Sequence, residues 1–342
     1  MHTFVIDYCP CEAINTTRKP GNGRDHTRFL AYSRRSQPGA IRFMTLSADS
    51  IRGLYTAIVT PLKSDKSVDF DALRKLVRYQ LDSGASGVVP IGGTGEYPAF
   101  SRSERKAIVE ACVEAAQGKP VIPGVVSPGF QDAVEAGKDF ASVGASGVMT
   151  VTPYYATGTQ EAIRSYFKAY RQEVDLPVLL YQIPYRTNVS VSADTIAGMA
   201  EDRSIVGMKY SSYDVPEFIK TVKAAGDKIA ILSGEEPLFA THVSLGARGG
   251  VLASATIYPK VWVEVFELAA QGKLRDALAC QESVNSIVQT LFLETNPGPL
   301  KKYMELVGMP VGSVRLPLQD PSEATLAKLQ NLAKQAMSAK LA

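Results

Sequence analysis

The sequence predicts an α/β protein, a (β/α)8 TIM barrel with a C-terminal helical appendage. Eight short apolar runs alternate with amphipathic stretches of roughly ten to eighteen residues, which is the pattern of alternating strands and helices. The runs are almost wholly apolar, as expected for parallel strands that are covered on both faces. The eight units occupy about 230 residues, close to the roughly 250 that are typical of such a barrel.

The predicted strands are bounded by glycines and loops. In chain order they are residues 53–59, 87–91, 120–126, 147–151, 177–183, 205–208, 229–232 and 249–253. Three of them begin at the last glycine of a Gly-Ala-x-Gly segment, and these segments are 84–87, 144–147 and 246–249. The first glycine of each segment supplies the left-handed residue that ends many helices. This internal similarity supports a repeated strand and helix unit.

The helices are predicted from apolar spacing and start signals. Residues 69–82 place their apolar side chains, Leu73, Leu76, Val77 and Leu81, on one face. A helix at 102–117 begins directly after Ser101, and Ser101-x-x-Glu104 has the pattern of a capping box. After the last strand only helical patterns follow, at 274–293, 299–307 and 322–338.

Three regions are therefore expected: an N-terminal extension at 1–46, a catalytic barrel at 47–273 and a helical region at 274–342 that is suited to oligomer contacts. The extension has no apolar period, so we expect disorder or a translation start placed too far upstream, with Met44 as the alternative start. A transit peptide is the competing interpretation, and the lack of an amphipathic stripe disfavours it. A doubly wound open sheet is the alternative fold, and the missing glycine-rich turn after the first strand counts against it.

Composition narrows the class of protein. The net charge of the chain is +3, and no basic stripe runs through its body, which disfavours nucleic acid as a partner. No apolar run reaches the length of a membrane span. The four cysteines show no repeated spacing, which favours a reducing compartment over a disulfide framework. We therefore expect a cytoplasmic protein.

The chemistry is sought at the carboxyl ends of the strands, where barrels of this type carry their active sites. Lys209 is the one lysine there, and no histidine is present, which excludes Ser-His-Asp and Cys-His sites and disfavours zinc and iron. The acidic residues Glu96, Glu235 and Glu236 are too few to favour magnesium. We therefore expect no metal.

Lys209 predicts imine chemistry. A lysine amine in an apolar pocket has a lowered pKa and attacks a carbonyl carbon, and the resulting imine draws electrons from the neighbouring carbon. Tyr181, which closes the preceding apolar run, is placed to carry the proton. The alternative is that Lys209 only extends its amine to water at the barrel rim.

Two further features favour an acidic substrate. The turn Gly92-Gly93-Thr94-Gly95-Glu96 leaves backbone N–H groups free to bind an anion such as a carboxylate, although a plain glycine turn remains the alternative. Arg186 is suited to a bidentate contact with a second carboxylate, or it is a surface arginine. Tyr154 and Tyr155 serve either rim packing or an inter-subunit contact.

Together these segments resemble the dihydrodipicolinate synthase and N-acetylneuraminate lyase family of class I aldolases. The resemblance covers about residues 53–318 and rests on Gly-x-Thr-Gly-Glu at 92–96, Thr-Pro-Tyr-Tyr at 152–155, Tyr-x-x-Pro-x-Arg-Thr at 181–187 and Gly-x-Lys at 207–209. Glu-Thr-Asn-Pro-x-Pro-x-Lys at 294–301 matches a further family segment. The resemblance implies a homotetramer of barrels that acts on pyruvate or another 2-oxo acid without a metal or organic cofactor.

The same resemblance implies a role for each site residue. Lys209 is the nucleophile and Tyr181 is the proton shuttle, while Gly93 and Thr94 bind the carboxylate of the 2-oxo acid. Tyr155 relays protons from a neighbouring subunit. Arg186 binds the distal end of a second substrate, which is an aldehyde or a sugar acid.

Two departures from the family pattern bear on the substrate. Gly93 stands where the lysine-pathway synthases usually carry a threonine of the proton relay, and the Gly-Gly-Thr-Gly-Glu turn is similar to that of keto-deoxy-sugar-acid dehydratases. Pro128 stands where many synthases carry an asparagine in a segment linked with lysine feedback, so we expect no inhibition by lysine. The leading hypothesis is a 4-hydroxy-tetrahydrodipicolinate synthase-like lyase. The alternatives are a sugar-acid dehydratase or aldolase, such as a 5-dehydro-4-deoxyglucarate dehydratase-like enzyme, and a non-catalytic protein that binds 2-oxo acids.

Overall fold

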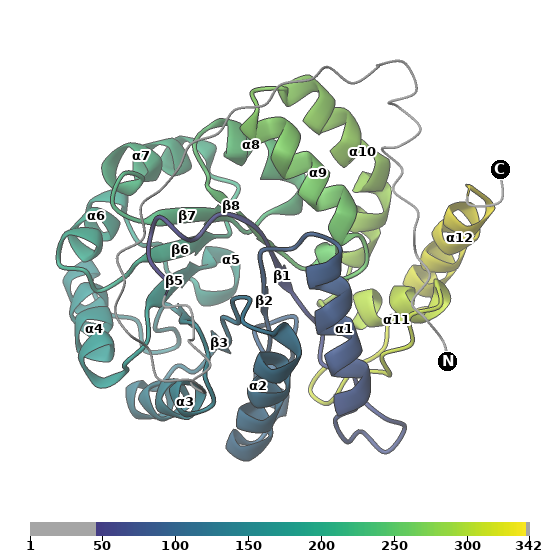
Figure 1. Ribbon diagram of the computed structural model, residues 1–342, viewed down its shortest axis with the longest axis horizontal. Coiled ribbons are helices and arrows are strands. Elements are labelled where there is room, and N and C mark those ends of the chain that lie inside the picture. Colours follow the sequence, from purple (N-terminus) through teal and green to yellow (C-terminus); the bar gives the residue numbers. More distant parts are fainter. Residues whose placement is uncertain (1–45, 340–342) are drawn as a thin grey trace, which may run out of the picture.

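The computed structural model describes residues 46–339 of the 342-residue chain. Figure 1 shows the strands gathered at the centre and the helices around them. The extension predicted at 1–46 lies, apart from its last residue, outside the described residues. No helix within residues 46–339 is long and apolar enough to cross a membrane.

The sheet consists of eight parallel strands, as predicted. They are β1 (Gly53–Ala57), β2 (Gly87–Val89), β3 (Gly124–Val125), β4 (Val148–Val151), β5 (Val178–Gln182), β6 (Gly207–Tyr210), β7 (Ala230–Ser233) and β8 (Gly249–Leu252). They pair in the order β2-β1-β8-β7-β6-β5-β4-β3. A parallel bridge from Val88 of β2 to Val121, which precedes β3, links the two ends of this order. The barrel is therefore nearly closed, and the predicted (β/α)8 fold is confirmed.

Helices connect the strands on the outside of the barrel. They are α1 (Phe70–Asp82), α2 (Arg102–Ala116), α3 (Phe130–Ser142), α4 (Gln160–Glu173), α6 (Ala193–Glu201), α7 (Val215–Ala225), α8 (Phe239–Ser244) and α9 (Pro259–Ala270). The predicted capping box is present, because Ser101 Oγ accepts from Glu104 N and the Glu104 carboxylate accepts from Ser101 N. Shorter turns of helix, η2 (Tyr97–Ala99), α5 (Pro184–Thr187), η3 (Glu236–Leu238) and η4 (Ser254–Thr256), follow strands β2, β5, β7 and β8.

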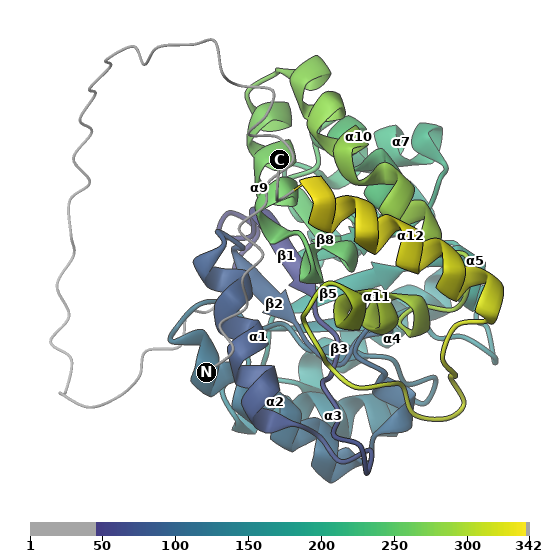
Figure 2. The same ribbon diagram turned by 90° about the vertical axis from the view of Figure 1, so that its right-hand side faces the viewer.

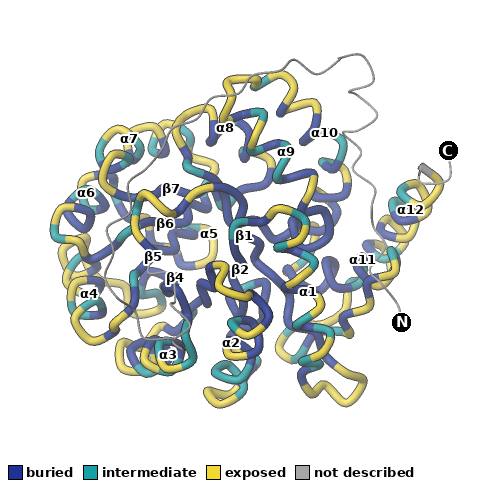
Figure 3. Tube along the Cα trace, viewed as in Figure 1, coloured by how far each residue is buried: buried dark blue, intermediate teal, exposed yellow. Residues whose placement is uncertain are grey.

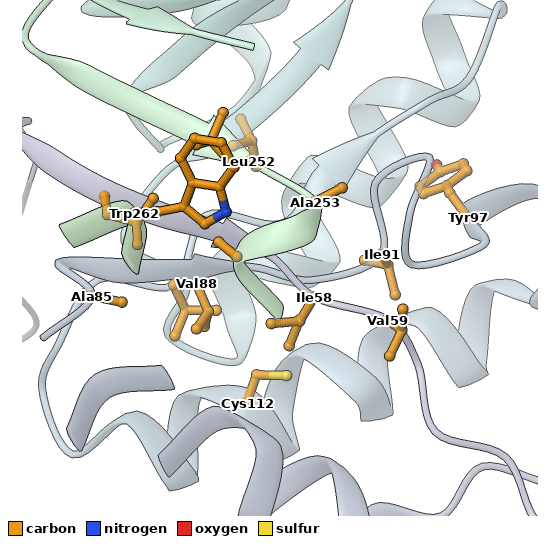
Figure 4. Close-up of a cluster of buried hydrophobic side chains, with 14 of the residues drawn as sticks. Ile58, Val59, Ala85, Val88, Ile91, Tyr97, Cys112, Leu252, Ala253 and Trp262 are labelled. Carbon is orange, nitrogen blue, oxygen red and sulfur yellow. The ribbon is translucent and has the colours of Figure 1, made fainter. Parts of the chain in front are cut away.

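The core has two layers. One fills the barrel interior and includes Tyr55, Met149 and Leu232. The other lies between the strands and the helices, where Figure 4 shows Val88 and Cys112 in one apolar cluster with Trp262. Figure 3 shows the resulting pattern, with buried strands inside and exposed outer faces on the helices. This pattern explains why the strands are nearly all apolar.

The C-terminal part contains α10 (Leu274–Leu291), α11 (Gly298–Leu306) and α12 (Glu323–Ala339). Helix α10 packs against α8 and α9, and α12 packs against α10 and α11. Figure 2 shows α11 and α12 beside the barrel. The three predicted helical patterns are therefore present as helices, whereas the division of the chain at residue 273 stays a prediction.

Candidate active site

A cavity of about 660 Å³ lies at the carboxyl ends of the strands. Its lining includes five of the residues expected from the sequence, namely Lys209, Tyr181, Gly93, Thr94 and Arg186. They come from β6, β5, the turn after β2 and helix α5. The fold thus gathers residues from four elements around one space, which is where ligands bind in barrels of this type.

Lys209 and Tyr181 are direct neighbours on adjacent strands. The register of β5 and β6 pairs them, and Lys209 Nζ lies 4.7 Å from the centroid of the Tyr181 ring. Both residues are buried, with exposed fractions of 7% and 8%. Each lies inside its strand rather than just after it, so the rigid sheet fixes both side chains. The amine and the phenol therefore occupy one enclosed site.

Gly234, directly after β7, leaves the space through which the Lys209 side chain passes. A Cβ atom at Gly234 would lie 2.6 Å from Lys209 Cε and 2.0 Å from Ser211 Oγ. Both distances are far shorter than a van der Waals contact. The sequence places Gly234 at a strand end, but its packing role depends on where the Lys209 side chain runs, which the pattern does not show.

The turn after β2 is tightly held. Thr60 Oγ1 donates to Gly95 O at 2.8 Å, and Asn296 Nδ2 donates to Thr94 Oγ1 at 2.9 Å. Gly95 cannot carry a side chain, because a Cβ there would lie 2.4 Å from Ile91 N. The turn therefore presents its residues, Gly93 and Thr94 among them, in one fixed geometry at the edge of the cavity.

A buried ion pair connects this turn to the C-terminal helices. Lys301 Nζ lies 2.7 Å from Glu96 Oε1, and both side chains are essentially inaccessible to solvent. Glu96 Oε2 also accepts from Arg315 N at 2.8 Å. Burial lowers the pKa of Lys301, and the neighbouring Glu96 carboxylate opposes that shift. The sequence indicated the segment 294–301 only as a matching motif; its role as the anchor of the turn was not predicted.

Arg186 lies beside the same turn. Its Nη1 atom is 3.9 Å from the position that a Cβ of Gly93 would occupy. The guanidinium therefore lies beside Gly93. This position places the guanidinium at the edge of the cavity, where it is suited to contact a carboxylate of a bound substrate.

The two tyrosines after β4 have different surroundings. Tyr154 lines the cavity and donates from its hydroxyl to Val126 O at 3.2 Å. Tyr155 is 96% exposed, takes a left-handed backbone conformation with φ of 73°, and is outside the cavity lining. Within a single chain Tyr155 therefore does not meet Lys209. The role expected for it involves a neighbouring subunit and stays a prediction.

Two glutamates complete the wall after β7. Glu235 and Glu236 both line the cavity, and both are buried. Burial, with a smaller effect from Glu236, raises the pKa of Glu235 to about 7, while Lys209 opposes the shift. Sequence reasoning considered the pair only as metal ligands. Among residues 46–339 no group of three or more His, Cys, Asp or Glu side chains is arranged to hold a metal ion.

Comparison with known proteins agrees with this geometry. Residues 50–336 match the dihydrodipicolinate synthetase family. The 4-hydroxy-tetrahydrodipicolinate synthase of Methanocaldococcus jannaschii is 35% identical over 285 residues, which is 83% of this chain and 98% of that protein. The corresponding synthase of Anaeromyxobacter sp. is 36% identical over 283 residues, which is 82% of this chain and 96% of that protein.

Solved structures show the same relation. The dihydrodipicolinate synthase of Acinetobacter baumannii, crystallised in complex with pyruvate, superposes on this chain with a TM-score of 0.81 at 33% identity. The superposition covers 84% of this chain and 99% of the Acinetobacter baumannii chain. The Thermotoga maritima enzyme gives a TM-score of 0.81 at 32% identity, with coverage of 84% and 99%. The family and the enzyme class predicted from the sequence are confirmed. This chain belongs to the dihydrodipicolinate synthetase family and is a lyase of the class I aldolase type.

Proposed function

We propose that this protein forms an imine between Lys209 Nζ and the carbonyl carbon of pyruvate or a related 2-oxo acid, and then joins that unit to an aldehyde. The reaction would be of the kind that 4-hydroxy-tetrahydrodipicolinate synthase catalyses. The observation that carries the proposal is the pairing of Lys209 with Tyr181 in one enclosed cavity. The pyruvate complex of the Acinetobacter baumannii relative supports the choice of first substrate.

Each group in the site has a task in this chemistry. Lys209 attacks the carbonyl and the imine then withdraws electrons from the adjacent carbon, which makes its proton acidic. Tyr181 carries that proton, because it pairs with Lys209 on the adjacent strand and lines the same cavity. Gly93 and Thr94 hold the carboxylate of the 2-oxo acid through the fixed turn, and Arg186 binds the second substrate. The imine supplies the electron sink, so the reaction requires no metal or organic cofactor.

A second candidate is dehydration of a keto-deoxy sugar acid. The specific observation in its favour is Gly93, which removes the hydroxyl that completes the proton relay of the lysine-pathway synthases and leaves space under Arg186. The imine step is the same in both candidates. They differ in the fate of the oxygen on C4, the second carbon beyond the imine carbon. The synthase-like reaction keeps this oxygen, and dehydration removes it as water.

We also propose a homo-oligomer, a tetramer or a dimer, in which Tyr155 meets the active site of a neighbouring subunit. The nearly complete exposure of Tyr155 and its left-handed backbone support a role outside its own chain. We expect this assembly in the cytoplasm, in keeping with the cysteine pattern of the sequence.

The test compares turnover of pyruvate with L-aspartate 4-semialdehyde against turnover of keto-deoxy sugar acids. Lys209→Arg serves as the matched variant, because it keeps the positive charge and removes the nucleophile. We expect the parent to turn over one of the two substrate classes and the variant to turn over neither. Retained activity in Lys209→Arg would refute the imine mechanism, whereas pyruvate binding with no reaction would favour a non-catalytic 2-oxo-acid binding protein.

A further inference from the structure

His242 is the only histidine among residues 46–339, and it takes no part in the site described above. It belongs to α8 and is completely buried. Its ring stacks on the ring of Phe218 from α7, with centroids 4.0 Å apart, and meets the ring of Tyr210 from β6 edge-on at 6.1 Å. An apolar side chain could fill this place without the cost of burying two ring nitrogens. The hydrogen bond of the imidazole is therefore what distinguishes His242 from an ordinary core residue.

This hydrogen bond joins His242 to the end of strand β7. His242 Nδ1 lies 2.9 Å from Ser233 Oγ, and Ser233 is the last residue of β7. The second ring nitrogen, Nε2, has no hydrogen-bond partner among the described residues. Burial lowers the pKa of His242 to about 4, so the ring is neutral at neutral pH and carries one N–H group. The position of that proton decides which of the two side chains donates.

The surroundings of Ser233 place the ring proton on Nδ1. Ser233 Oγ also accepts from Glu235 N and donates to Glu235 O, both at 3.4 Å. A proton on Nδ1 lets His242 donate to Ser233 Oγ and leaves the hydroxyl proton for Glu235 O. A proton on Nε2 would take the hydroxyl proton away from Glu235 O and bury an N–H group without a partner, which costs free energy. His242 is therefore the donor, and Ser233 closes the turn to Glu235.

The turn that begins at Ser233 packs against Lys209. Ser233 pairs with Tyr210 in the register of β6 and β7, directly after the pair that contains Lys209. Gly234 N donates to Tyr210 O at 2.8 Å, which joins the two strand ends. A side chain at Gly234 would collide with Lys209, so the path of the lysine depends on the position of this turn. His242 contacts both Tyr210 and Ser233, and it therefore supports the strand ends beside Lys209.

The same turn sets the position of Glu235 in the cavity wall. Glu235 Oε1 has no hydrogen-bond partner within the part of the chain that the structure describes, so the backbone of the turn governs where this carboxylate lies. Ser233 Oγ contacts both the N–H and the carbonyl group of Glu235. Loss of the bond from His242 frees the Ser233 hydroxyl to rotate. One hydrogen bond outside the cavity thus influences two residues inside it.

We propose that His242 is a positioning residue, which donates to Ser233 and thereby holds the following turn where the Lys209 amine can reach the carbonyl carbon of a 2-oxo acid. The inference rests on the imine proposed at Lys209. The turn after β2, which holds the carboxylate of the 2-oxo acid, is fixed by separate contacts. His242 therefore governs the rate at which the amine attacks and leaves the affinity for the 2-oxo acid unchanged.

The experiment uses the full chain and separates the hydrogen bond of His242 from its packing. His242→Phe keeps the stack on Phe218 and removes the donor, whereas His242→Asn supplies an N–H donor close to the place of Nδ1 without the ring. Ser233→Ala removes the acceptor, and a double variant combines this change with His242→Phe. Ser244→Ala is the matched control, because this hydroxyl of the same helix donates to Ala240 O within α8.

The assay measures imine formation under borohydride over a range of pyruvate concentrations, together with the thermal unfolding midpoint. We expect His242→Phe and Ser233→Ala each to lower the maximal rate about tenfold, with no change in the pyruvate concentration that gives half of that rate. The double variant should be no slower than the slower single variant, because both changes remove the same hydrogen bond. His242→Asn should react faster than His242→Phe, and Ser244→Ala should react at the rate of the parent.

Three results would overturn the assignment while leaving the imine mechanism intact. The first is a folded His242→Phe protein that forms the imine at the parent rate, even if its unfolding midpoint is lower, since His242 would then be a core residue only. The second is a double variant whose loss equals the product of the two single losses, since the residues would then act independently. The third is a parent rate in Ser233→Ala, which decides the matter if His242→Phe does not fold. Absence of the pyruvate adduct in the parent would instead refute the proposed function.

Discussion

Replacement of Gly234 by alanine tests whether the Lys209 side chain must pass where the structure places it. The new Cβ would lie 2.6 Å from Lys209 Cε and 3.0 Å from Lys209 Cγ. Relief of these contacts to an ordinary separation of about 3.5 Å moves the end of the lysine by about 1 Å. A displacement of that size at a reacting atom costs about a hundredfold in rate. The added methyl group costs about 1 to 3 kcal/mol of folding free energy by overpacking.

The assay measures the rate of imine formation with pyruvate under borohydride, together with the thermal unfolding midpoint. Gly129→Ala is the control, because a Cβ at Gly129 meets nothing within 4 Å and its φ of −92° suits any residue. We expect the control to react at the rate of the parent. A folded Gly234→Ala protein that forms the imine at the parent rate would show that Lys209 does not follow the path described.

The other predictions concern single groups. Tyr181→Phe should lower turnover by about 10² to 10⁴ in steady-state kinetics, and a loss below tenfold would assign the proton to another group. Arg186→Met should raise the KM of the second substrate by about tenfold to a hundredfold without a similar effect on pyruvate, because one charge-assisted contact is lost. Lys301→Met should lower the free energy of unfolding by about 3 to 5 kcal/mol in denaturant titrations, since it leaves Glu96 buried without its partner; a change below about 1 kcal/mol would contradict the pairing. Free L-lysine should not inhibit turnover by this protein, and a micromolar inhibition constant for L-lysine would contradict that expectation.

Most of the fold could be predicted because its signals are local. Apolar runs, the Gly-Ala-x-Gly segments and the capping box at Ser101 each depend on a few consecutive residues, and each corresponds to an element of the structure. Six of the eight predicted strands were longer than the observed ones, whereas β6 and β7 have the predicted length and lie two residues and one residue later in the chain. Residues 120–126, for example, contain only the short strand Gly124–Val125, because residues 120–123 are buried as well although they lie outside that strand.

The candidate site was predictable only in part. Lys209 and Tyr181 follow from their places in neighbouring strands, and the register pairs them. The anchoring of the turn by Asn296 and Lys301 depends on contacts across some 200 residues of sequence, at separations of 202 and 205 positions, and no local pattern encodes it. Glu235 was visible at its strand end, but its unpartnered oxygen becomes evident only once the cavity is known.

The most direct test of the central claim is to treat the protein with pyruvate and borohydride and to map the reduced adduct by mass spectrometry of its peptides. The account predicts one adduct, on Lys209, and none in Lys209→Arg. An adduct on another lysine, or no adduct on the folded protein, would contradict it.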